Sequence, residues 1–168
     1  MSTEESEPAP LVLTESERRR ARRSLTDDMR LALLSEIGAR AMYDHLGRHV
    51  RDEVLSRVLQ QLNEEGAFAV EQLREIIGKL GARARRTSFR RRAIARGLAL
   101  ASRVSGPRPV LRLCQNAEQT VARWYSAYAH FLVRIGETEA ARSCLELERL
   151  KLRHAQVLSA WIQNQRSR

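Results

Sequence analysis

The sequence contains few cysteine, glycine, proline and aromatic residues, and it has no long apolar run. Its 168 residues include 2 cysteines, 8 glycines and 4 prolines, while 43% of the residues are hydrophobic and 5% are aromatic. This composition favours a compact, largely helical protein over a β-sandwich or a disordered chain. No stretch of about 18 apolar residues could span a membrane, and the acidic N-terminus is unlike a secretory signal. We therefore expect a soluble, cytoplasmic protein.

Cysteine chemistry and the common catalytic motifs are also missing. Cys114 and Cys144 have no metal-ligand spacing, and in the antiparallel helices expected below they would lie about 15 Å apart at 1.5 Å per residue. Free thiols in a reducing compartment are therefore expected. The sequence contains no glycine-rich phosphate loop, no nucleophile elbow and no Cys/His zinc pattern.

The charge of the chain is large but uneven. The formal net charge is +10 at pH 7. The segment 82–110 carries no acid and nine arginines, and without it the chain is near neutrality. The basic character therefore belongs to one connection and not to the whole surface.

Apolar residues at helical spacing predict an all-α protein with four helices, over about 28–49, 52–80, 110–135 and 138–163. The ends 1–27 and 164–168 are predicted to be charged tails. The connection 82–109 is predicted to hold a short helix over 93–104. The second helix shows a heptad seam, formed by Leu59, Leu62, Gly66, Ala69, Leu73, Ile76 and Leu80.

A motif on the first helix returns on the third. Glu36 is followed at i+3 by a small apolar residue and at i+7 by Tyr43, and Glu118 is followed in the same way by Tyr125. These spacings place each acid and its tyrosine on one stripe of a helix. Since a carboxylate in an apolar stripe is costly to bury without a partner, two such motifs 82 positions apart suggest a duplicated helix pair with a paired or coordinating interior.

The Glu-x-x-Ala-x-x-x-Tyr pattern at Glu36, and the ending Leu73-Arg-Glu-Ile-Ile-Gly-Lys-Leu-Gly81, resemble the ferritin-like superfamily in its rubrerythrin and bacterioferritin branches. The resemblance implies a four-helix bundle over 28–163 with one long crossover between the second and third helices. It also implies a dimetal site that takes a Glu from the first and third helices and a Glu-x-x-His from the second and fourth.

The ligand positions that this resemblance implies are only partly filled. On the second helix they fall at Gly66 and Ala69, and a shift by one residue restores an acid at Glu65 but no histidine. On the fourth helix they fall at Lys151 and His154, so a base stands in place of an acid. The candidate metal ligands are Glu36, Glu65, Glu118 and His154.

Lys151 changes the expected chemistry of this interior. Two divalent metals need several carboxylates to offset their charge, and two or three acids beside an ammonium group do that poorly. We therefore expect Lys151 to form a buried ion pair with Glu36 or Glu118 in the place of a metal. No cofactor is the favoured expectation, and iron or another divalent metal is the alternative.

The basic connection is the second candidate site. Its apolar residues Ile94, Leu98 and Leu100 lie beside the arginine clusters 85–86 and 90–92, a pattern that fits a solvated link, an anionic membrane surface or nucleic acid. With Phe89 as its only aromatic residue, the segment slightly favours lipid headgroups over single-stranded nucleic acid. The residues expected to contact an anionic surface are Arg85, Arg86, Arg90, Arg91, Arg92 and Arg96.

Three functional hypotheses follow. The first is a non-catalytic structural or interaction protein that keeps the ferritin-like fold and offers a basic surface. The second is a divergent metal-binding oxidoreductase. The third is a protein that binds nucleic acid or lies at the periphery of an anionic membrane. A non-catalytic role is favoured over an enzyme, no small-molecule substrate can be identified, and a homo-oligomer is left open.

Overall fold

The computed structural model describes residues 13–84 and 107–164, and within them it contains four α-helices and no strand. The helices are α1 (Glu15–His49), α2 (Glu53–Lys79), α4 (Pro107–Arg134) and α5 (Thr138–Asn164). The predicted all-α, four-helix architecture is confirmed. None of these four helices has an apolar stretch that could cross a membrane.

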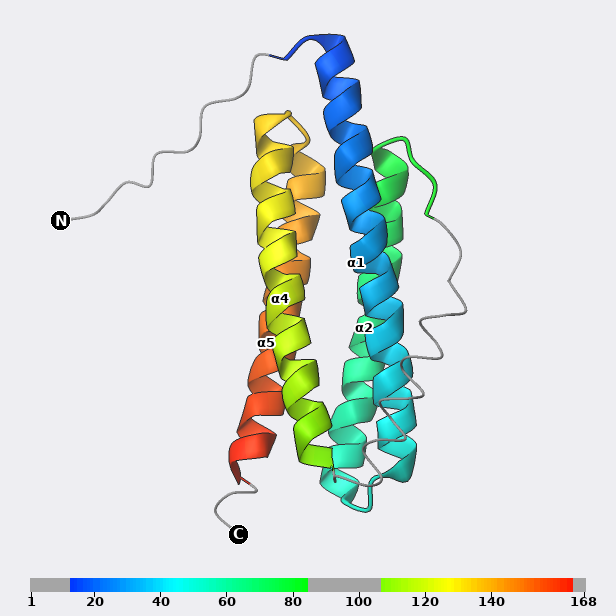
Figure 1. The fold of residues 1–168 in the computed structure, drawn as a ribbon, viewed down its shortest axis with the longest axis vertical. Helices are drawn as coiled ribbons and strands as arrows, with labels where there is room; N and C mark the ends of the chain where they lie inside the picture. Colours follow the sequence, from blue (N-terminus) through cyan, green and yellow to red (C-terminus); the bar gives the residue numbers. More distant parts are fainter. Residues whose placement is uncertain (1–12, 85–106, 165–168) are drawn as a thin grey trace, which may run out of the picture.

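The helices form two closely packed pairs, α1 with α2 and α4 with α5. The pairs meet through α1 against α4 and α2 against α5, and neighbouring helices run antiparallel (Figure 1). As a result α2 and α4 run in the same direction, so α2 ends and α4 begins at opposite ends of the bundle (Figure 1). The predicted helix over 93–104 lies outside the described residues.

The turns fall where the sequence places them. The Asp52 carboxylate accepts a hydrogen bond from the Leu55 backbone N–H at 2.9 Å and caps the start of α2. Gly136, between α4 and α5, has a φ of 82°, a left-handed conformation that glycine adopts without strain. All seven residues of the predicted heptad seam are buried, which confirms that they form the inner face of the second helix.

The first helix begins at Glu15 and not near Asp28, so the expectation of a tail through residue 27 is wrong. Thr14 and Glu17 cap this start with a reciprocal pair of side-chain to backbone contacts. Leu25 is 5% exposed and belongs to the core. The buried face of these first turns is hard to recognise in the sequence, because five arginines interrupt its apolar pattern. Long arginine stems can lie along a packed face while their charged ends reach solvent.

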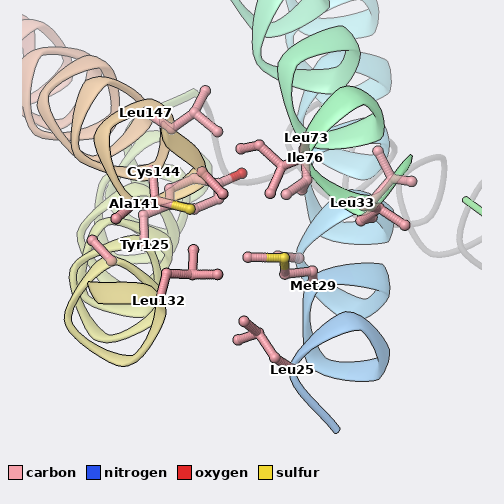
Figure 2. Packing of buried hydrophobic residues seen from close by; sticks show 14 of the residues in the cluster. Leu25, Met29, Leu33, Leu73, Ile76, Tyr125, Leu132, Ala141, Cys144 and Leu147 are labelled. Carbon is pink, nitrogen blue, oxygen red and sulfur yellow. The ribbon is translucent and has the colours of Figure 1, made fainter. Parts of the chain in front are cut away.

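The core consists of two hydrophobic clusters separated by a polar layer. One cluster lies toward the α4–α5 turn, and Figure 2 shows side chains of all four helices converging there. The other lies toward the α1–α2 turn and includes Met42, Leu59, Leu111 and Leu158. The polar layer between them holds the residues that the sequence singled out.

The early start of α1 leads to a test of the core. Leu25→Ala removes a buried side chain, and we expect the free energy of unfolding to fall by about 2–4 kcal/mol. Leu31→Ala on the same helix is the matched control, because Leu31 is 53% exposed, and should change stability by less than about 0.5 kcal/mol. Urea denaturation followed by circular dichroism measures both. Equal effects would show that residues before 28 do not pack as described.

Candidate functional site

Four charged or titratable side chains are almost completely buried between the two hydrophobic clusters. Glu36 comes from α1, Glu118 from α4, and Lys151 and His154 from α5. Their exposed fractions lie between 0 and 3%. Charges that far from water are retained only with close partners, so the contacts among these groups decide whether the layer is stable.

Lys151 lies between the two buried glutamates. Its Nζ donates a hydrogen bond to Glu36 Oε2 at 2.6 Å and lies 3.2 Å from Glu118 Oε2. The predicted buried ion pair is thus confirmed, and it involves both acids. One ammonium group links α1, α4 and α5 through the interior.

The two tyrosines of the repeated motif cross over to the opposite glutamates. Tyr43 on α1 donates its hydroxyl hydrogen to Glu118 Oε1 at 2.5 Å, and Tyr125 on α4 donates to Glu36 Oε1 at 2.9 Å. Each copy of the motif therefore supplies an acceptor to the other copy and receives a donor from it. The sequence places each tyrosine on the stripe of its own glutamate and does not predict these bonds to the glutamate of the other motif.

His154 connects this layer to α2. Its Nε2 lies 2.9 Å from Glu65 Oε2, and its Nδ1 lies 3.6 Å from Glu118 Oε2. Toward the surface, the Glu65 carboxylate accepts hydrogen bonds from Gln61 Nε2 at 2.8 Å and from Arg153 Nη2 at 3.2 Å. The structure therefore brings together all four candidate ligands, Glu36, Glu65, Glu118 and His154. Glu118 Oε2 and His154 Nδ1 are buried without a hydrogen bond.

The two buried glutamates have pKa values displaced in opposite directions. Burial raises the pKa of Glu36 above its usual value, against the opposing charge of Lys151. Burial also acts to raise the pKa of Glu118, but the His154 ring, the Lys151 ammonium group and the Tyr43 hydroxyl together lower it to about 2. Lys151 keeps its proton, because the two carboxylates raise its pKa despite its burial. Glu118 and Lys151 are therefore ionised together at neutral pH.

These side chains do not fit a dimetal centre. The Lys151 ammonium group occupies the space between the two carboxylates that would have to bridge the metals. At the α2 position where an acid is implied, the Arg40 stem covers Gly66 so closely that an added Cβ would lie 2.8 Å from Arg40 Cγ. Among the described residues, no group of three or more His, Cys, Asp and Glu side chains is arranged to hold a metal ion.

The described residues hold further side chains of metal-binding type, and the arginine-rich connection lies outside them. His45 and His49 stack on each other with ring centroids 4.3 Å apart near the end of α1. Cys114 and Cys144 are free thiols. The arginines expected to contact an anionic surface lie outside the described residues, and they are Arg85, Arg86, Arg90, Arg91, Arg92 and Arg96.

Comparison with protein-family models, with curated proteins and with solved structures gives no match.

Removing the central cation should destabilise the bundle. Lys151→Met keeps a similar volume but leaves Glu36 and Glu118 facing each other, and we expect a loss of about 3–5 kcal/mol in the free energy of unfolding. Adding Glu36→Gln and Glu118→Gln to this variant removes the repulsion and should restore much of the loss. Chemical denaturation measures all variants, with Lys79→Met at a half-exposed site as control. A triple variant no more stable than Lys151→Met would contradict the ion-pair account.

The low pKa of Glu118 predicts a loss of stability in acid. The unfolded chain takes up this proton near pH 4.5 and the folded protein only near pH 2, so the free energy of unfolding should fall across that interval. Glu118→Gln cannot take up the proton and should show a shallower fall. Glu36 has a raised pKa and contributes with the opposite sign at higher pH. The urea midpoints of wild type and Glu118→Gln between pH 2 and 6 test this prediction, with Glu146→Gln as the surface control. The same fall in stability with acid in wild type and in Glu118→Gln would refute it.

Proposed function

We propose that the protein is a ferritin-like bundle that holds its interior with an internal cation and acts as a non-catalytic structural or interaction module. The observation that carries this proposal is the contact of Lys151 Nζ with both Glu36 and Glu118, at 2.6 and 3.2 Å. The ammonium group supplies positive charge where the ferritin-like resemblance implies metal. The folded interior is then complete without a cofactor.

The direction of the helices supports the ferritin-like connectivity in this proposal. Two antiparallel pairs whose second and third helices run in the same direction require one connection along the length of the bundle (Figure 1). The 22 residues between Ala84 and Pro107 would cover about 33 Å even as a helix, at 1.5 Å per residue. The reciprocal bonds between the two Glu and Tyr motifs further support a duplicated helix pair as its origin.

An oxidoreductase is the less supported alternative. A di-iron oxidase needs carboxylates that are free to bind and release metal and oxygen. Here each buried carboxylate is already held by an ammonium group and a tyrosine hydroxyl. Neither Gly66 nor Ala69 can supply a ligand from α2.

The interaction role rests on the charge of the connection between α2 and α4. That segment carries eight arginines without an acid, and the net charge of the whole chain is +10. An anionic macromolecule is the partner class that this charge attracts, through release of its counterions or through its surface potential.

Metal analysis of the purified protein tests the proposal. We expect protein from iron-replete cells to contain far less than one iron or other transition metal per chain by inductively coupled plasma mass spectrometry. Glu118→Ala should leave that content unchanged, as should the control Glu146→Ala at an exposed position of α5. Near-stoichiometric iron that disappears in Glu118→Ala but not in Glu146→Ala would overturn the proposal and favour the oxidoreductase.

A further inference from the structure

The start of α1 extends beyond the ends of the other three helices (Figure 1). Five arginines lie on these first turns, namely Arg18, Arg19, Arg20, Arg22 and Arg23. The sequence suggested a tail here, but the helix is capped by Thr14 and Glu17 and packs through Leu25. The arginines are therefore displayed on a fixed scaffold, which lowers the entropy lost when they bind a partner.

Three of these arginines are available to a partner. Arg22 pairs with Glu137 at the α4–α5 turn and is half-buried. Arg19 lies 3.9 Å from Glu15 with both side chains 62% exposed, a pair that contributes little. Arg20 and Arg23 are exposed and have no ion pair within 4 Å among the described residues.

The start of the basic connection after α2 lies against the side of α1 that carries Arg19 and Arg23. Arg30 donates a hydrogen bond from its Nε to the Arg83 backbone carbonyl at 3.0 Å, which fixes the start of the basic connection against α1. Arg19, Arg23 and Arg30 recur at i, i+4 and i+11, so they lie on one side of the helix. The Arg83 side chain is exposed. Arg83, 53 positions after Arg30, thus lies beside a row of arginines on α1 that is about 16 Å long at 1.5 Å per residue.

The composition of this row selects among anionic partners. The exposed side chains between Thr14 and Ser24 are all polar or charged, so this helix has no apolar group to insert into a bilayer. The same stretch has no aromatic ring on which an unpaired base could stack. What remains is recognition of closely spaced phosphates. A length of about 16 Å matches about five phosphate steps of one strand in a duplex.

We propose that Arg19, Arg20, Arg23 and Arg83 form a binding surface for the phosphate backbone of double-stranded nucleic acid, without sequence preference. This inference rests on the proposed interaction role and adds its location and its partner. Guanidinium groups suit the task because each offers several donors in a fixed plane to phosphate oxygens. Glu15 and Asp27 lie on the same stripe beside Arg19 and Arg30, and against these two acids the four residues Arg19, Arg23, Arg30 and Arg83 leave the row with a net positive charge.

Fluorescence anisotropy with a 30-base-pair DNA duplex at several salt concentrations tests the inference. For wild type we expect log K to fall steeply with log salt. Replacing Arg19, Arg20 and Arg23 by glutamine should reduce the magnitude of this slope by about 3, and adding Arg83→Gln should reduce it by about 1 more. Circular dichroism confirms that the variants fold.

The matched control removes the same charge at the other end of the bundle, through glutamine at Arg48, Arg57 and Arg112, which are all exposed. An equal loss of slope in both triple variants would overturn the inference, because net charge alone would then explain binding. A parallel flotation assay uses phosphatidylserine–phosphatidylcholine vesicles. Binding to these vesicles but not to DNA would overturn the inference and leave the interaction role standing. Binding to neither would contradict both.

Discussion

Two carboxylates cannot remain ionised inside a helical bundle without a cation between them, and Lys151 is the cation that this chain supplies. Its ammonium group ties Glu36 of α1 and Glu118 of α4 to α5 at the level where the two hydrophobic clusters meet. Desolvation of three charges costs several kcal/mol per group, and only their close contacts and the added hydrogen bonds offset it. The register of three helices is fixed by this requirement, because a shift of one turn would separate the charges.

The repeated Glu and Tyr motif makes the contacts of α1 and α4 in the polar layer symmetric. In neighbouring antiparallel helices, a residue seven positions after one glutamate comes level with the glutamate of the other helix, so Tyr43 meets Glu118 as Tyr125 meets Glu36. One short motif, used twice, therefore satisfies two acids with two donors. The symmetry stops at α2 and α5. There Lys151 has no counterpart, and His154 turns to Glu65 at the edge of the layer.

Much of this could be predicted from the sequence, because it depends on local signals. Asp52 and Gly136 mark turns by their own chemistry, and the buried Lys151 ion pair follows from a base on an apolar stripe opposite two acids. The features that were missed depend on relations between distant segments. The tyrosine bonds require the relative direction of α1 and α4, which consecutive turns do not determine. The first turns of α1 contact the α4–α5 turn through the pair of Arg22 with Glu137, 115 positions away, and a pattern of apolar residues cannot reveal such a contact.

The contact between Arg40 and Gly66 has a consequence for how such a protein can change. The Arg40 stem lies where any side chain at position 66 would begin, and its Nε is held by Asn63. A mutation that placed an acid at 66 would have to displace that arginine, while an acid in place of Lys151 would add a third negative charge to the interior. Each change made alone would therefore require a rearrangement of the interior. Acids at both positions would need a further substitution at Arg40, so the polar layer can change its charge only through several coordinated substitutions.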